Sequence, residues 1–497
     1  MLVDNILLGL ETALRPDNLM WCLVGVSMGT IIGVIPGIGA LAAMSMLFPL
    51  TFYLDPTSAL IMLAGIWYGS TYGGSTAAIL LNVPGTPSSA VTALEGYPMS
   101  RQGRAGVALF MTAIASFAGA SLGIVIMMLF SPLIARSAMS FGAPEYFSLM
   151  LLGLVAAATI TFGSVAKSLS MVVLGVLLGC VGMDAYTGQP RFTFGVMHLY
   201  ESLSLMPLAM GLFGVAEIAA SVGLVNLAQM TRAQYAMRAM LPTRDDMRRS
   251  PLPMLRGGTL GAVLGALPGV GPSVASFMSY AIERKVAAQP ERFGKGAIEG
   301  IMAPETANNA ADQTAFIPTM TLGIPGSPSM AIMIGALMIH GISPGPTLIR
   351  DHPDLFWGLV MSFWIGNVLL LVINVPLIGL WVRLLSIPYR FLYPSILVFV
   401  CIGVYSVGNS SANVWLVLGF GVLGYLMRVL DFSPAPLILG FVLGPMMEEY
   451  FRRSMLVARG DLAIFVERPI SATVLALAAM IVLARLAQMR RTTMARR

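Results

Sequence analysis

The sequence has little charge for its length. Of its 497 residues only 10% are Asp, Glu, Lys or Arg, whereas 57% are hydrophobic. A soluble domain carries about 25% charged residues, so this composition excludes a chain built from soluble domains. Apolar stretches of roughly 20 residues recur from end to end, which is typical of a polytopic membrane protein made of α-helices.

The chain also lacks the signatures of several function classes. Its three cysteines lie far apart and its three histidines do not cluster, so we expect neither a disulfide nor a metal site. No phosphate-binding loop and no H-E-x-x-H motif occurs, which argues against an ATPase and against an intramembrane hydrolase of the metalloprotease kind. The net charge is only +6, and its basic residues lie mainly in loops. We therefore expect no enzyme, no resident cofactor and no nucleic-acid partner, and a lipid bilayer around the chain.

Two Pro-Gly motifs occur in each half of the chain, in the same order. GVIPGIG at 33–39 reappears as GALPGVG at 265–271, an offset of 232 residues. VPGTPSS at 83–89 reappears as IPGSPSM at 324–330, an offset of 241 residues. Proline removes a backbone donor and glycine permits dihedrals that break a helix. Interrupted apolar segments at matching positions in two halves indicate a transporter's binding site.

The loop charges predict that the two halves have opposite orientations. The central linker, the loop at 284–295 and the C-terminal tail are basic, which is typical of the cytoplasmic side. Residues 257–281 then begin and end on one side, as a re-entrant hairpin does. The loop after the second motif carries Arg101 and Arg104, whereas its counterpart at 340–354 carries one Arg and two Asp. This opposite bias is what an inverted-topology repeat requires.

We predict an all-α polytopic membrane protein with an inverted-topology repeat, two re-entrant helical hairpins and about 11 crossings (10–12). The N-terminus is predicted to be periplasmic and the C-terminus cytoplasmic. The predicted organisation is a first repeat at 1–228 (hairpin about 19–48, broken helix about 58–94), a cytoplasmic linker at 229–256, a second repeat at 257–450 (hairpin about 257–281, broken helix about 297–340), and an extra C-terminal helix with a basic tail at 451–497.

The hairpin tips predict a substrate site made largely of backbone. A helix broken at mid-membrane leaves free N–H and C=O groups, which favour anions and cations respectively. The second motif adds hydroxyl and amide groups that can hold carboxylate oxygens. The predicted substrate-binding residues are Pro36, Gly37, Gly39, Asn82, Gly85, Thr86, Ser88, Gly269, Gly271, Gly326, Ser327 and Ser329. Two alternatives are a plain Gly-rich kink at the first motif and helix capping by the hydroxyls of the second.

A polar stretch in one half only predicts a coupling-ion site. Glu305, Asn308, Asn309 and Asp312 are spaced i, i+3, i+4 and i+7, so they share one face if the stretch is helical. The matching stretch at 67–76 has hydroxyl groups but no acid. Because acids at membrane depth mark ion or proton pathways, these four residues and Thr314 are predicted to bind the coupling ion, Na⁺ or alternatively H⁺. The competing interpretation is a helix end whose acids are solvated.

Over nearly its whole length the chain resembles the large membrane subunit of the tripartite tricarboxylate transporters. The resemblance is carried by GVIPGIG at 33–39, YGSTYGGS at 68–75, NVPGTP at 82–87 and APETANNA at 303–310. It implies a secondary transporter of the bacterial inner membrane, with a small four-helix membrane subunit and a periplasmic solute-binding protein as partners. It implies uptake of a di- or tricarboxylate such as citrate, driven by an ion gradient, usually sodium, and we expect an elevator-like motion. The alternative is a stand-alone organic-anion permease or channel without a binding-protein partner.

Overall fold

The described part of the chain is almost entirely helical. The computed structural model describes residues 2–35, 39–82, 84–138, 141–159, 164–184, 186–216, 240–267, 270–384 and 410–494, with isolated positions at 219 and between 394 and 405. The first half contains α1 (Leu2–Ala13), α2 (Pro16–Val34), α3 (Gly39–Thr51), α4 (Pro56–Leu81), η1 (Pro87–Ser89), α5 (Ala90–Arg101), α6 (Ala105–Ala138), α7 (Ala143–Thr159), α8 (Val165–Gly179), β1 (Gly182–Met183), β2 (Pro190–Arg191), η2 (Met197–Leu199), α9 (Leu205–Ala209) and the π-helical η3 (Met210–Val215).

The second half continues the helical pattern. It contains α11 (Arg244–Arg249), α12 (Pro251–Gly265), α13 (Gly271–Val286), η6 (Pro290–Arg292), α14 (Glu299–Thr314), α15 (Phe316–Leu322), α16 (Pro328–Ile339), α17 (Leu348–Asp351), α18 (Pro353–Asn374), α19 (Ile378–Leu384), α21 (Ser411–Val429), α22 (Ala435–Val457), α23 (Ile464–Glu467) and α24 (Pro469–Met494). The helix α22 continues through residue 450, where the sequence analysis ended the second repeat.

The helix lengths and composition agree with an all-α membrane protein. Within the described ranges, α2, α6, α18 and α21 are long and apolar enough to cross a membrane. Six shorter apolar segments accompany them. The two short strands, β1 and β2, pair antiparallel in the connection between α8 and α9, and they are the one departure from the helical pattern among the residues described.

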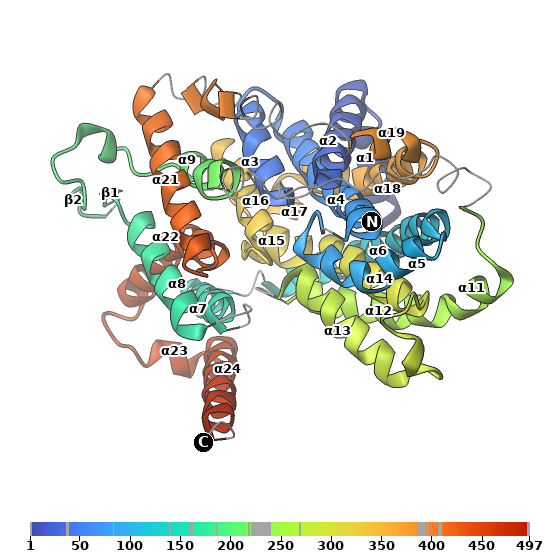
Figure 1. Cartoon of the computed structure of the whole chain (residues 1–497). Helices are drawn as coiled ribbons and strands as arrows, with labels where there is room; N and C mark the ends of the chain where they lie inside the picture. The colour runs from blue at the N-terminus through green and yellow to red at the C-terminus, as the bar shows by residue number, and fades with distance from the viewer. Residues whose placement is uncertain are drawn as a thin grey trace.

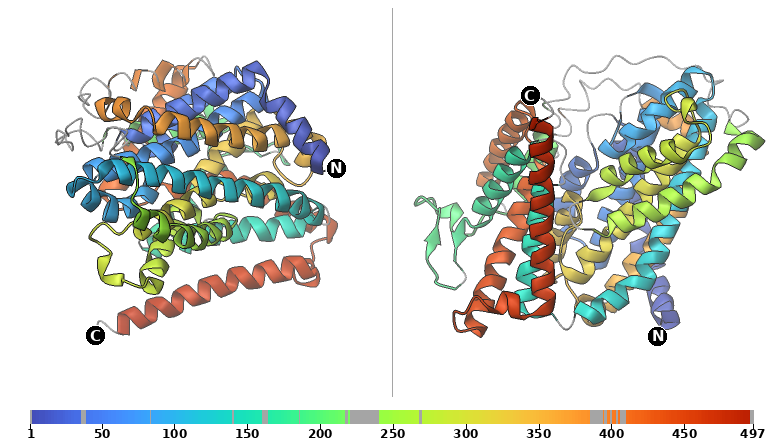
Figure 2. Two further views of the ribbon diagram at one scale, coloured as in Figure 1. Left: turned by 90° about the vertical axis from the view of Figure 1, so that its right-hand side faces the viewer. Right: turned by 90° about the horizontal axis from the view of Figure 1, so that it is seen from below.

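The helices lie in two groups (Figure 1). In the group that we call the central group, α2 packs on α4, α12 and α13 pack on α14, and α6 and α18 also pack against these helices. In the group that we call the lateral group, α22 packs on α7 and α8, and α24 packs on α7. Helix α16 contacts both α4 and α22, so it lies between the groups. Figure 2 shows the chain ends at opposite ends of the helical bundle in both views.

Two helix pairs of the central group pack through glycine at every fourth position. An added Cβ on Gly25, Gly29 or Gly33 of α2 would lie 2.3, 2.4 and 2.2 Å from the carbonyl oxygens of Met62, Ile66 and Ser70 of α4. On α12, a Cβ on Gly257, Gly261 or Gly265 would lie 2.1, 2.1 and 2.4 Å from the carbonyl oxygens of Ala303, Ala307 and Ala311 of α14. Helix backbones approach this closely only where side chains are absent, as in small-residue membrane contacts.

We call these two glycine-lined contacts the α2–α4 seam and the α12–α14 seam. They are related by the offsets of the Pro-Gly motifs. Gly29 and Gly261 stand 232 residues apart, and their partners Ile66 and Ala307 stand 241 residues apart. The same pair of offsets relates every contact in the two seams. The α2–α4 pair therefore corresponds to the α12–α14 pair in both sequence and packing.

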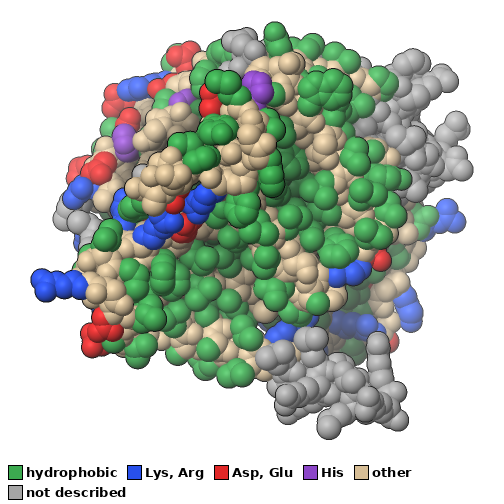
Figure 3. Space-filling model, turned by 90° about the vertical axis from the view of Figure 1, so that its left-hand side faces the viewer, with side chains coloured by type: hydrophobic (Ala, Val, Ile, Leu, Met, Phe, Trp, Pro, Cys, Tyr) green, Lys and Arg blue, Asp and Glu red, His purple; other side chains and the backbone are tan. Residues whose placement is uncertain are grey.

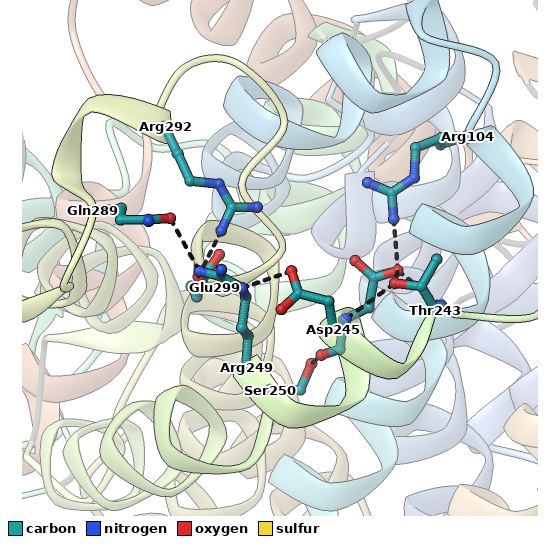
Figure 4. Close-up of polar contacts among 9 residues, drawn as sticks. Arg104, Thr243, Asp245, Arg249, Ser250, Gln289, Arg292 and Glu299 are labelled. Carbon is teal, nitrogen blue, oxygen red and sulfur yellow. Dashed lines mark hydrogen bonds and ion pairs between the residues drawn. The ribbon is translucent and has the colours of Figure 1, made fainter.

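Three basic segments meet at one end of the bundle (Figure 4). Arg104 pairs with Asp246 at 2.6 Å, and Arg249 and Arg292 each lie 3.3 Å from Glu299. Burial raises the pKa of Asp246, but hydrogen bonds from Arg104 and Thr243 outweigh it and hold this pKa below its ordinary value. The loops predicted to share the cytoplasmic side thus lie together.

The loop at 340–354 contacts a part of the chain that is distant in sequence. The His340 Nε2 lies 3.0 Å from the carbonyl oxygen of Thr51, across 289 residues of sequence. The loop at 340–354 and the end of α3 are therefore neighbours.

Candidate substrate and ion site

The predicted polar stretch forms one buried helix. Residues 300–314 of α14 are all buried, and Glu305, Asn308, Asn309 and Asp312 each have relative exposures of 0 or 1%. The helix that their spacing requires is present. Burial rules out the competing interpretation of solvated acids at a helix end. Buried polar groups need partners, so the contacts of these side chains define what the site can do.

Glu305 is surrounded by hydroxyl groups from three helices. Its Oε1 accepts hydrogen bonds from Ser75 of α4, at 2.6 Å, and from Thr92 of α5. Its Oε2 accepts one from Ser116 of α6 at 3.1 Å. Hydrogen bonds to a charged group are worth about 1.5–3 kcal/mol each. Three such donors satisfy both carboxylate oxygens, so this side chain ties α14 to α4, α5 and α6.

Asp312 is equally buried but has fewer hydrogen-bond partners than Glu305. Its Oδ2 accepts a hydrogen bond of 2.9 Å from Thr71 of α4. Its Oδ1 makes no hydrogen bond of ordinary geometry among the described residues, but the indole N–H of Trp67, which also has no other partner, interacts with this carboxylate. Thr71 and Asp312 stand 241 residues apart, the offset of the second motif, so they occupy corresponding positions in the two halves. The acid of one half meets the hydroxyl group of the other.

Amide oxygens beside Asp312 are also unpartnered. In the part of the chain that the structure describes, Asn308 Oδ1 and Nδ2, Asn309 Oδ1 and Gln313 Oε1 are buried without hydrogen bonds. Asn309 uses its Nδ2 to donate to the Glu305 carbonyl at 3.0 Å. Unpartnered buried polar atoms are rare and call for a functional explanation. Carboxylate and amide oxygens are the donors that hard cations prefer.

Thr314 lies on a different side of α14. Its hydroxyl donates to the Ala310 carbonyl at 3.1 Å and sits against Gly265, on the seam with α12. The structure therefore brings Thr314 next to the hairpin that precedes α14, and not into the hydrogen bonds of Glu305 and Asp312.

The tips of the first motif are described in part. Pro36, Gly37 and Gly269 lie outside the described residues. Gly39 and Gly271, which begin α3 and α13, have φ values of +54° and +68°. Glycine adopts this left-handed backbone without steric cost. The two predicted tips therefore share one local conformation at positions 232 residues apart.

The second motif has close backbone packing in both halves. An added Cβ on Gly85 would lie 2.1 Å from the Gly33 carbonyl and 2.6 Å from the Gly74 Cα. The corresponding Gly326 faces Ala315, at 3.3 Å from its carbonyl oxygen. Asn82 ends α4 in a left-handed conformation with φ of 57°. Gly74 and Ala315 stand 241 residues apart, so these two contacts correspond, whereas the contact of Gly85 with Gly33 is closer than any contact of Gly326.

The hydroxyls of the second motif cap helices. Thr86 and Ser89 form a capping box at η1, and Thr86 Oγ1 lies 3.1 Å from Ser88 Oγ. Ser327 caps α16 by accepting from Met330 N at 3.4 Å, and Ser329 is buried in the first turn. These contacts establish the capping alternative for Thr86 and Ser327. Capping leaves contact with a ligand possible, so substrate binding by this group stays a prediction.

One polar contact that the sequence analysis missed joins the halves near the start of α14. Glu95 of α5 is fully buried and accepts hydrogen bonds from Tyr280 Oη at 2.7 Å and from the backbone N–H groups of Gly296 and Ala297 at 2.8 and 2.9 Å. The Gly294 N–H donates to it as well. Thr92 and Ser116 were not predicted either, because they have no periodic or motif signal. Thr71 could have been found, because it precedes Asp312 by the motif offset.

The sequence matches a known protein family. The family model described as "Tripartite tricarboxylate transporter TctA family" matches residues 19–439. The chain belongs to this family. The predicted resemblance is confirmed, and TctA membership makes the chain a membrane component of a tripartite tricarboxylate transporter. The word tripartite implies partner subunits, and a transporter family indicates a protein that moves its substrate rather than converting it.

Two relatives of this TctA protein occur in Agrobacterium vitis. An uncharacterized 52.8 kDa protein in the TAR-I ttuC' 3' region is 50% identical over 478 residues, which cover 96% of this chain and 94% of the relative. An uncharacterized protein in the TAR-II ttuC' 3' region is 52% identical over 217 residues, covering 44% of this chain and 90% of the relative. No solved structure matches the chain.

Proposed function

We propose that this TctA protein is the ion-coupled membrane subunit that imports a di- or tricarboxylate into the bacterial cytoplasm. A periplasmic solute-binding protein would deliver the substrate, and a small four-helix membrane subunit would complete the transporter. The observation that carries this proposal is the buried meeting of α4 hydroxyls with α14 acids, Thr71 with Asp312 and Ser75 with Glu305. Buried ionisable residues are costly in a membrane protein, and they commonly mark ion or proton pathways.

The coupling ion is proposed to bind at Asp312. The unpartnered oxygens of Asp312, Asn308, Asn309 and Gln313 lie on consecutive turns of α14. An all-oxygen ligand set with one negative charge suits Na⁺, and a proton carried by Asp312 is the alternative. Glu305 has its oxygens satisfied by hydroxyl groups, so we assign it a positioning role in which it keeps α14 against the neighbouring helices.

The carboxylate substrate is proposed to bind at the hairpin tips. Helices α3 and α13 begin at Gly39 and Gly271, and the N–H groups in a first helical turn have no intrahelical partner. Such N–H groups attract carboxylates, and glycine allows close approach. The second motif, with Gly85 and Gly326, would complete the site from the two broken helices.

The proposed architecture is an inverted-topology repeat. The two glycine seams with their common offsets support the repeat, and the Thr71–Asp312 contact supports a pseudo-two-fold axis that passes close to it. In this proposal the hairpins are re-entrant and the chain crosses the inner membrane about 11 times, with the N-terminus in the periplasm. An elevator-like motion would carry the hairpins of the central group past the lateral group, where Gly153 of α7 faces Ile324, the first residue of the second motif in the second half.

Transport in proteoliposomes tests this function. The chain is reconstituted with its small membrane subunit, and a radiolabelled carboxylate is added with its periplasmic binding protein under an inward gradient of Na⁺ or of H⁺. We expect accumulation that requires both the binding protein and one of the gradients. Uptake that runs without the binding protein, or that only equilibrates the substrate, would instead support the stand-alone permease or channel.

A further inference from the structure

The connection between α8 and α9 projects sideways from the lateral group. It contains the β1–β2 hairpin and η2, and it is described from 180 to 204 except at 185. Figures 1 and 2 show it beside the bundle, extending across the direction of the helices and not beyond their ends. A segment at the side of the bundle contacts either the lipid or a neighbouring protein in the membrane.

Two charged groups of the connection are turned inward. Asp184 is 5% exposed and pairs with Arg452 of α22 at 3.0 Å, and Arg191 pairs with Glu448 of α22 at 3.0 Å. The N–H of Tyr186 and the guanidinium of Arg452 lower the pKa of Asp184 to about 2, although partial burial opposes them. The base of the connection is therefore held firmly against α22 by charged contacts.

The outward side of the connection is apolar. Phe194 and Met197 are 86 and 85% exposed. The other large exposed apolar or aromatic residues are Met183, Tyr186, Phe192, Val196 and Tyr200. A buried Asp184 beside so many exposed large apolar side chains is the reverse of what water favours.

The backbone presents these side chains in an unusual conformation. Phe192 and Phe194 have φ values of 52° and 50°, and the Thr193 side chain between them is buried. Bulky residues seldom adopt this left-handed backbone, and such strain persists where it serves a function. Here it turns two phenylalanines outward while Thr193 packs inward.

The apolar side continues a lipid-facing stripe on α8. Leu169, Val173 and Leu177 are 52, 50 and 48% exposed and are four residues apart, so they share one face. That helix ends at Gly179, directly before the connection. Figure 3 shows this face of the molecule, on which hydrophobic side chains cover most of the surface.

We propose that the α8–α9 connection is an interfacial anchor that inserts Phe192, Phe194 and Met197 into the boundary between the lipid headgroups and acyl chains. Interfacial segments bury Trp, Phe and Leu side chains at this boundary, and Tyr, present here as Tyr186 and Tyr200, is enriched there. The exposed polar residues Thr187, Gln189, His198 and Glu201 keep the connection from going deeper, because polar groups need water or headgroup partners. The anchor holds the lateral group at a fixed depth in the bilayer.

Spin labels on the full chain in phosphatidylethanolamine and phosphatidylglycerol vesicles test this inference. Cys22, Cys180 and Cys401 are replaced by Ala, and a nitroxide is attached at Phe194→Cys. Val173→Cys on α8 is the lipid-facing reference, and Glu291→Cys in an exposed loop is the water-facing reference. Relaxation by oxygen reports lipid, and relaxation by a water-soluble nickel chelate reports water.

We expect the ratio of oxygen to nickel accessibility at Phe194→Cys to exceed that at Glu291→Cys several-fold and to approach that at Val173→Cys. A ratio equal to that at Glu291→Cys would overturn the proposal. Low access to both reagents would also overturn it, since a second protein surface would then cover the site. The same measurement at Met197→Cys must agree, which guards against a local disturbance at one label.

Discussion

The helices α4 and α14 occupy corresponding places in the two halves but carry different polar groups. Each packs against a preceding helix through the same four-residue seam, Gly29 on Ile66 in one half and Gly261 on Ala307 in the other. Helix α4 contributes the hydroxyls of Thr71 and Ser75, whereas α14 contributes the carboxylates of Asp312 and Glu305. The two helices therefore share their glycine packing, but one supplies hydroxyl groups and the other supplies carboxylates.

This difference indicates how a duplicated fold can make a single site. If both halves carried acids, two buried like charges would meet near Thr71 and Asp312, which is strongly unfavourable. If both carried hydroxyls, no charged ligand for a cation would be present. With one acid opposite one hydroxyl group, Oδ2 is hydrogen-bonded, whereas Oδ1 has no hydrogen bond of ordinary geometry and has the indole N–H of Trp67 as its neighbouring donor.

The largest expected effect follows from removing the charge of α14. Asp312→Asn keeps the shape of the side chain but removes the anionic ligand, so the sodium affinity should fall by about 30-fold or more, given about 2–5 kcal/mol for a buried charge contact. The measurement is the sodium concentration for half-maximal uptake. Asp245→Asn, at an exposed acid of the linker, is the control. An unchanged sodium response in Asp312→Asn would remove this residue from coupling.

The next effect concerns the packing that the two halves share. Gly29→Ala and Gly261→Ala each place a Cβ about 2 Å from a carbonyl oxygen, so each should destabilise the fold by about 1–3 kcal/mol. Thermal unfolding in detergent measures this effect. Gly419→Ala is the matched control, because its Cβ would meet nothing within 4 Å. If only one of the two seam variants loses stability, the seams are not equivalent.

The smallest expected effects come from removing one hydroxyl donor of Asp312 or of Glu305, and they distinguish the roles of the two acids. Thr71→Val removes the hydroxyl donor of Asp312 with little change in shape, and the sodium affinity should fall roughly tenfold for about 1–2 kcal/mol. Ser116→Ala removes one of three donors to Glu305, and we expect less than about a threefold change. Sodium titrations of uptake compare the two variants. Thr71→Ser keeps the hydroxyl group, so we expect its sodium affinity to stay close to that of the wild type. A larger loss in Ser116→Ala than in Thr71→Val would reverse the roles given to the two acids.

The sequence predicts much of what periodicity and repetition determine. Low charge and recurring apolar stretches predict the helical membrane class, and the spacing of Glu305 and Asp312 predicts their common helix face. The two motif offsets also relate the glycine seams, since the glycine that begins each first motif, Gly33 or Gly265, is the last of its seam. These features are local or repeated, so they can be read without tertiary structure.

The donors around the acids could not be predicted in the same way. Thr92 and Ser116 reach Glu305 from α5 and α6, at sequence distances of 213 and 189 residues. Nothing in their spacing distinguishes them from other hydroxyl residues in apolar helices. Glu95 binds backbone N–H groups of Gly296 and Ala297, and backbone partners leave no sequence signal. Such contacts depend on which helices become neighbours.

Sodium binding to the purified full chain tests the central claim most directly. The unfolding temperature is measured in NaCl and in choline chloride at equal ionic strength, for the wild type and for Asp312→Asn. A ligand that binds only the folded state raises its stability, so sodium should raise the unfolding temperature of the wild type and leave that of Asp312→Asn unchanged. An equal rise in both proteins, or a rise abolished by Asp245→Asn instead, would contradict an ion site built on Asp312.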